Sequence, residues 1–155
     1  MTVDAALIFC TAQNVFASSA TVQSTDWIDW KVAQNLGDGC PPVVEIVVTT
    51  TFAGGTAVTF QLCAVDSAGN NPEILDSTEA IPIASLTAAA AGVPGGAGTV
   101  WHLRMSPKKG LPTSTKTHLR LQVVNSGANT AGAITAHMQP DVGTAAPGKA
   151  YASGY

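Results

Sequence analysis

Residues 42–66 read PVVEIVVTTTFAGGTAVTFQLCAVD, and this stretch decides the fold class. Side chains alternate along residues 42–52 and again along residues 56–66, with the glycine pair Gly54-Gly55 between them. Alternation with a period of two predicts strands, and glycine tolerates the positive φ of a tight turn. The stretch therefore predicts a β-hairpin. Both faces of its first run are largely apolar, so we expect one face in the core and the other against a second surface.

Shorter alternating runs bounded by Gly, Pro, Asn and Asp predict the other strands, and no amphipathic helix is convincing. These runs are residues 20–23, 27–32, 78–84, 99–106, 118–125 and 131–139. Pro82 within its run favours an edge strand or a bulge. We expect an all-β protein, an antiparallel jelly roll or β-sandwich of about eight strands. Residues 1–141 form this domain, and residues 142–155, which lack periodicity, form an extended or flexible C-terminal tail.

Charged residues are scarce: they make up 11% of the chain, against about 25% in ordinary soluble domains. The net charge of -3, with Lys108-Lys109 as the one cationic pair, predicts no nucleic-acid partner, because phosphate binding needs a basic patch. No segment is long and apolar enough to predict a membrane span. A surface with so little charge is expected to be covered by other subunits or solvated by hydroxyls and amides.

The three cysteines, Cys10, Cys40 and Cys63, form an odd and widely spaced set without a Cys-x-x-Cys pair, so no zinc site is predicted. Residues 1–9 contain no Lys or Arg and do not resemble a signal peptide. We expect reduced thiols and assembly in a cytoplasm. Cys63 lies in an apolar strand pattern, which predicts a small buried side chain.

The three histidines, His102, His118 and His137, each lie on an expected strand. Metalloenzymes of the cupin type use a His-x-His pair with a nearby Glu, and neither feature occurs here. A small cupin-like metalloenzyme is therefore a minor hypothesis, and we expect the histidines at surfaces or interfaces. No metal and no other cofactor is predicted.

No catalytic motif emerges from the remaining polar residues. There is no Gly-x-Ser-x-Gly elbow for a nucleophilic serine. Paired carboxylates could be Glu73 with Asp76, or the acids of the segment 26–30, Asp-Trp-Ile-Asp-Trp. That segment combines acids with aromatic rings, as sugar-binding clefts do, although a strand with Trp27 in the core and Trp30 near an edge or subunit contact explains it as well. We expect no enzyme.

In the order and composition of its segments, the chain resembles the Bbp16-type capsid cement (decoration) proteins of tailed bacteriophages. The resemblance covers about residues 7–141 and rests on a combination of segments. They are FCTAQNVFASSATVQSTDWIDW, an LGDG turn, the stretch PPVVEIVVTTTFAGGTAVTFQLCAVDSAG, AIPIASLTAA, THLRLQVVNSG and TAGAITAHMQPD. The family implies an antiparallel jelly roll that forms trimers outside an icosahedral shell and bridges major capsid subunits. The family implies no catalytic residues for this chain.

The resemblance implies a non-enzymatic protein of the virion exterior whose partners are its own copies, as a homotrimer, and the major capsid protein. Candidate contact residues for these partners are Trp27, Trp30, Tyr151 and Tyr155. The alternative is a carbohydrate- or receptor-binding module of a head fibre or tail tip, which would use Trp27 and Trp30 with Asp26 or Asp29.

Overall fold

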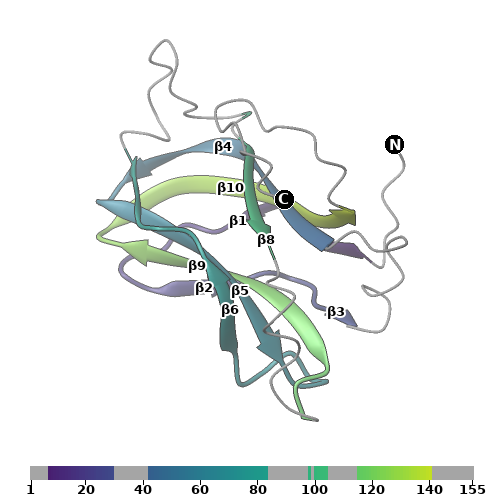
Figure 1. Cartoon of the computed structure of the whole chain (residues 1–155). Coiled ribbons are helices and arrows are strands. Elements are labelled where there is room, and N and C mark those ends of the chain that lie inside the picture. The colour runs from purple at the N-terminus through teal and green to yellow at the C-terminus, as the bar shows by residue number, and fades with distance from the viewer. Residues whose placement is uncertain (1–6, 30–41, 84–97, 99, 105–114, 141–155) are drawn as a thin grey trace.

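The computed structural model describes residues 7–29, 42–83, 98, 100–104 and 115–140. Within these ranges ten strands form two antiparallel sheets that face each other as two layers (Figure 1). The first sheet has the order β1 (Ile8–Asn14), β10 (Asn129–Pro140), β4 (Pro42–Gly54), β8 (Val100–Arg104). The second has the order β2 (Thr21–Gln23), β9 (His118–Ser126), β5 (Ala57–Val65), β6 (Glu73–Ser77), with β3 (Ile28–Asp29) beside β9 and β7 (Ile81–Pro82) beside β5. The predicted all-β sandwich is confirmed.

The core lies between the two sheets and consists of the alternate, inward-facing side chains of their strands. The predicted inward rows are buried, because a period of two places every second side chain on one face of a strand. These rows include Val44, Ile46 and Val48 of β4, Val58, Phe60, Leu62 and Ala64 of β5, and Leu119, Leu121 and Val123 of β9. Phe52 and Phe60 meet edge to face with their ring centroids 6.4 Å apart. Aromatic contacts of this geometry tie the two layers together.

Three connections cross from one sheet to the other and stack at one end of the sandwich. They lead from β1 to β2, from β4 to β5 and from β9 to β10. The Thr56 N–H donates to the Ser126 carbonyl at 2.8 Å, and the Ser19 N–H donates to the Gly127 carbonyl at 2.8 Å. We call this end the arch stack. Because neighbours in one sheet continue as neighbours in the other, the order favours the jelly-roll form, which stays a prediction.

Two buried asparagines hold the arch stack from inside. The Asn125 amide nitrogen donates to the Val15 carbonyl at 2.9 Å and to the Ala20 carbonyl at 3.0 Å. The Asn129 amide nitrogen donates to the Asn125 side-chain oxygen at 2.6 Å. Buried carbonyls cost free energy unless they accept hydrogen bonds. The asparagine pair therefore supplies hydrogen bonds to the connecting segments beyond those of the strand ladders.

The predicted hairpin of residues 42–66 is wrong in its pairing, although both of its strands exist. β4 pairs with β10 and β8, whereas β5 pairs with β9, β6 and β7, so the two strands belong to different sheets. Gly54 and Gly55 have φ values of 69° and 61°, a conformation that suits glycine in a hairpin turn and in an arch alike. The chain crosses the sandwich because this packs the apolar inner face of β4 against that of β5.

The remaining differences concern short strands. β1 and β6 were not predicted, and the strand expected at residues 78–84 is reduced to β7, Ile81–Pro82, which pairs with β5. Of the strand expected at residues 27–32, Ile28–Asp29 is described as β3 and residues 30–32 lie outside the described ranges. The expected tail, residues 142–155, also lies outside them. No helix in the described ranges is long and apolar enough to cross a membrane.

Candidate functional site

Trp27, the one predicted contact residue within the described ranges, lies half-exposed at the margin of the second sheet. Its side chain is held in place: the Arg120 guanidinium carbon lies 5.1 Å from the centre of the indole ring, and the indole N–H donates to the Ser67 carbonyl at 3.3 Å. A cation over an indole face is favourable. Trp30, Tyr151 and Tyr155 lie outside the described residues.

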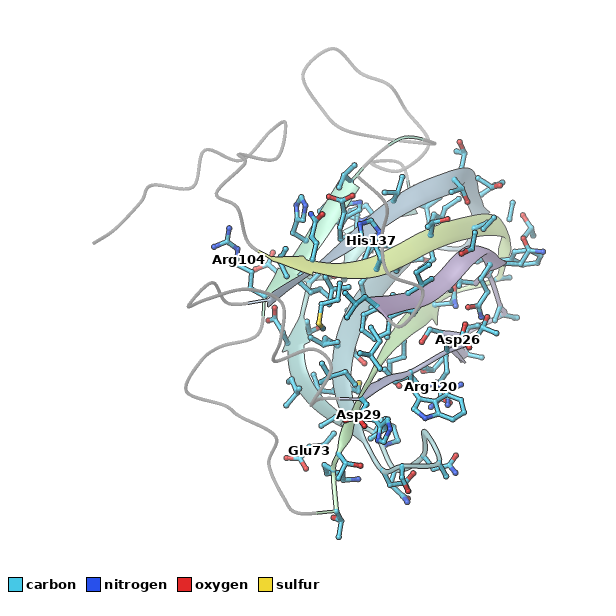
Figure 2. All side chains as sticks on the ribbon, turned by 90° about the vertical axis from the view of Figure 1, so that its right-hand side faces the viewer. Asp26, Asp29, Glu73, Arg104, Arg120 and His137 are labelled. Atoms are coloured by element: carbon cyan, nitrogen blue, oxygen red, sulfur yellow. The ribbon has the colours of Figure 1, made fainter. Side chains whose placement is uncertain are left out.

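Arg120 of β9 joins two connecting segments beneath this ring. Its Nε and Nη2 donate to the Ser24 carbonyl at 3.1 and 2.8 Å, and its Nη1 donates to the Gly69 carbonyl at 2.7 Å. Burial lowers the pKa of the Arg120 guanidinium, and the charge of Asp26 opposes that effect. Figure 2 shows Asp26 and Arg120 on the same side of the molecule, away from His137. Because its guanidinium bonds two backbone carbonyls, Arg120 has a structural role, which is to hold these two segments together.

The loop after β5 is fixed by Asp66. This carboxylate accepts hydrogen bonds from the Ala68 N–H at 3.0 Å, the Asn70 N–H at 2.9 Å and the Asn71 amide at 2.9 Å. The bond from the Asn70 N–H, followed by that from Asn71, lowers the pKa of Asp66. An aspartate that bonds the backbone a few residues on is a common turn former. Asp66 therefore has a structural role, which is to hold this loop in its conformation.

The outer face of the second sheet carries a row of uncharged polar side chains, which we call the amide face. The pairing register aligns Gln23, Gln122, Gln61 and Ser77 across four strands. The Gln122 amide donates to the Gln61 side-chain oxygen at 2.7 Å. The next row, Thr21, Val124 and Thr59, is also uncharged. Exposed surfaces in water usually carry charge, and on this face the charge of Arg120 lies in the neighbouring row, outside the two uncharged rows.

The outer face of the first sheet is different, because it carries a carboxylate between two histidines. Glu45 of β4 pairs across the sheet with His102 of β8 and His137 of β10. Its Oε2 lies 3.3 Å from the His102 Nε2 and its Oε1 lies 3.6 Å from the His137 Nε2. The Gln139 amide donates to Glu45 Oε2 at 2.9 Å. The side chains of His102, His137 and Glu45 are 14%, 15% and 25% exposed, so the cluster is largely covered.

Sequence reasoning missed this cluster, since the three residues are far apart in the chain and only strand register aligns them. His118, the third histidine, lies on β9 of the other sheet, where its Nδ1 is 2.8 Å from the Thr117 hydroxyl. In the part of the chain that the structure describes, no group of three or more His, Cys, Asp or Glu side chains is placed to hold a metal ion.

Two thiols are protected in the core. Burial raises the pKa of Cys10 to about 11 and that of Cys63 to about 12, from an ordinary 9.0. A nucleophilic cysteine needs a lowered pKa, because the thiolate is the reactive form. The interpretation of Cys63 as a small buried side chain is confirmed, since it is 1% exposed.

A cavity of about 510 Å³ opens where β8 of the first sheet faces the β6–β7 segment of the second. We call it the edge cavity. Its lining includes the acids Asp76 and Glu79, the apolar Ile81 and Leu103, and the rings of Trp101 and His102. The Asp76 carboxylate accepts a hydrogen bond from the Arg104 N–H at 2.9 Å. The buried indole N–H of Trp101 has no hydrogen-bond partner among the described residues.

The described residues thus present four features: the uncharged amide face, the half-exposed Trp27, the largely covered histidine–carboxylate row and the edge cavity. No curated protein sequence matches the chain. A protein-family model, that of Bbp16, matches residues 9–138. This match spans both sheets from β1 almost to the end of β10. The chain therefore belongs to the Bbp16 family.

Proposed function

We propose that this protein is a non-enzymatic capsid cement protein of a bacteriophage. It assembles as a homotrimer on the outer capsid surface, where it bridges and stabilises neighbouring major capsid subunits. The observation that carries the proposal is the family match over residues 9–138, together with the resemblance of the same segments to capsid cement proteins. It is made in the host cytoplasm and works in the virion.

The amide face supports this proposal on physical grounds. Its outer side chains, such as Thr21 and Ser77, are exposed in the single chain, and its two rows carry no charge. Obligate interfaces are depleted in charge and enriched in apolar area relative to ordinary surface. Ile74, with 51% of its area exposed, and Trp27 add apolar area at the margin of the same sheet.

Glycan binding through Trp27, the alternative function, has less support. Sugar sites need an open aromatic face with acceptors and donors beside it. Here the ring is engaged by Arg120 and its N–H by the Ser67 carbonyl.

The proposal is tested by native mass spectrometry of the purified chain and by its binding to capsids that lack it. We expect a trimer that binds and raises the temperature at which the shells open. Thr59→Glu, which places a charge on the amide face, is expected to weaken assembly while the fold is retained. Thr11→Glu, at an exposed position of β1, is the matched control and is expected to assemble normally.

A monomer that binds no capsid would contradict the proposal. A glycan-dependent signal that Trp27→Ala removes would favour the alternative function.

A further inference from the structure

The loop between β5 and β6 contains contacts beyond those that form its turn. One oxygen of the Asp66 carboxylate, Oδ1, accepts the hydrogen bonds from the Ala68 and Asn70 N–H groups and so forms the turn. The other oxygen, Oδ2, accepts a hydrogen bond from the side-chain nitrogen of Asn71, Nδ2, at 2.9 Å. The Lys116 ammonium, two residues before β9, donates to the backbone carbonyl of Asn71. Asn71 is thus held at its side chain and at its carbonyl.

The backbone of Asn71 is strained and the loop around it is fixed. Its φ is 53°, in the left-handed region that L-residues rarely adopt, and the ring of Pro72 restricts it further. The Gly69 carbonyl accepts a hydrogen bond from Arg120 at 2.7 Å, and a Cβ at Gly69 would lie 2.8 Å from the Trp27 ring. Strained backbone that is held in place by its surroundings occurs at sites that carry chemistry.

The residue after Asn71 decides which reaction of the asparagine side chain is open. In most sequences the next backbone nitrogen attacks the side-chain carbonyl, and the asparagine loses ammonia. Proline has no N–H, so this route is closed at Asn71-Pro72. The reaction that remains is attack by Asn71 Nδ2 on the backbone carbonyl carbon of the same residue, which closes a succinimide ring and breaks the bond to Pro72.

We propose that the folded chain cleaves itself slowly between Asn71 and Pro72. The bond from Nδ2 to the carbonyl carbon forms as the bond from that carbon to the Pro72 nitrogen breaks, so the atoms balance without a further reactant. Asp66 Oδ2 accepts the proton that Nδ2 loses, and the Lys116 ammonium stabilises the negative charge that develops on the carbonyl oxygen. The proton passes from Asp66 through water to the Pro72 nitrogen, which leaves as an amine.

The cleaved chain is expected to stay folded, because the strands of its two pieces alternate in both sheets. Residues 1–71 contain β1 to β5, and residues 72–155 contain β6 to β10. In the first sheet β10 lies between β1 and β4, and in the second β9 lies between β2 and β5. Cleavage therefore leaves the native mass unchanged, apart from the water that later opens the succinimide, and becomes visible when the chain is denatured.

Denaturing mass spectrometry of the full-length chain, kept for days at neutral pH, tests the proposal. We expect residues 1–71 with a C-terminal succinimide, one water lighter than the free acid, and residues 72–155 with an N-terminal proline. Asn71→Gly, which suits the positive φ and removes the nucleophile, is expected to stay intact. Asp66→Asn, which keeps an oxygen for the turn, and Lys116→Met are each expected to slow cleavage about tenfold or more. Urea midpoints show that each variant is folded.

Two controls separate this site from ordinary breakdown of the bond. Glu73→Gln is matched to Asp66→Asn, because it removes an exposed acid next to Pro72, and it is expected to cleave at the rate of the parent chain. The parent chain held unfolded in urea is expected to cleave about tenfold more slowly or less, because Asp66 and Lys116 no longer hold Asn71. Equal rates in the folded and unfolded chain would overturn the proposal. So would a chain that stays intact, or a parent rate in the Lys116 variant.

Discussion

Two regions of this sandwich, the arch stack and the edge cavity, differ in how many of their polar groups are bonded within the chain. In the arch stack, Asn125 and Asn129 bond each other, and Asn125 also donates to two carbonyls of the connection between β1 and β2. At the edge cavity, the Trp101 indole N–H is buried without a partner, and β8 pairs on one side only, among the described residues. The arch stack also leaves one buried atom without a described partner, the Asn129 side-chain oxygen, but its other amide groups are bonded within the chain.

The difference indicates where the stability of the single chain resides. A buried and bonded polar network contributes to the free energy of unfolding of a single chain, because breaking one member leaves others without a partner. A strand edge that pairs on one side only contributes little to that free energy. Substitutions in the arch stack should therefore lower the free energy of unfolding, whereas substitutions at the edge cavity should change it little.

The largest loss is expected for Gly55→Ala in the arch stack. A Cβ at Gly55 would lie 1.5 Å from the Asn129 side-chain oxygen, and the residue has a φ of 61°. Overlap and left-handed strain together should lower the free energy of unfolding by about 3 kcal/mol or more, measured by urea denaturation. Gly98→Ala is the control: its φ is 92°, yet nothing lies within 4 Å, so strain alone should cost about 1–2 kcal/mol. Equal losses of unfolding free energy in the two variants would show that the arch stack is not tightly packed.

Asn125→Ala should have the next largest effect. It leaves the Val15 carbonyl and the Asn129 amide without these partners, at a cost of about 2 kcal/mol, whereas the Ala20 carbonyl keeps its bond from the backbone N–H of residue 125. Asp76→Ala, at the edge cavity, removes the hydrogen bonds that the carboxylate accepts from the Arg104 and Ser77 N–H groups, which water can replace, and should cost about 0.5–1 kcal/mol. Thermal unfolding of both variants gives the comparison. If Asp76→Ala lowered the free energy of unfolding as much as Asn125→Ala does, the distinction between the two regions would be wrong.

Alkaline pH should weaken both sheets through their buried thiols. The folded-state pKa of Cys10 is raised to about 11 and that of Cys63 to about 12, so above pH 9 the unfolded chain releases these protons more readily. Stability is then constant below pH 9 and falls as the pH rises toward 11 to 12, by about 1 kcal/mol per thiol at pH 10. Urea midpoints measured between pH 7 and 10 test this. Cys63→Ala should be less sensitive to pH over that range, and an unchanged pH dependence would contradict the assignment.

Sequence alone predicts the inward rows well, because burial follows the alternation along each strand. Val58, Phe60 and Leu62 of β5 fall where the period of two places them. The pairing of β4 with β5 was mispredicted because Gly54-Gly55 suits a hairpin and an arch equally. Only long-range packing, such as that of Phe52 on Phe60, decides between them.

The contact surfaces were less predictable for the same reason. Glu45 meets His102 and His137 through strand register, which no local spacing encodes. The contact role predicted for Trp27 stays a prediction, and its partner within the chain, Arg120, lies far along the sequence on β9. β1 and β6 escaped prediction because β1 is irregularly paired and β6 is short, and both have mixed burial.

The smallest effect on stability is expected for Glu79→Gln at the rim of the edge cavity. Glu79 is exposed, so the free energy of unfolding of the dissociated chain should change by less than about 0.5 kcal/mol. The fraction of trimer at micromolar concentration, read by native mass spectrometry, should not change either, because the proposed assembly uses the amide face and not this rim. Glu73→Gln, an exposed acid outside the cavity, should change neither quantity. A loss of more than about 1 kcal/mol in the Glu79 variant alone would mean that this carboxylate stabilises the folded chain, and the contrast with the arch stack would then disappear.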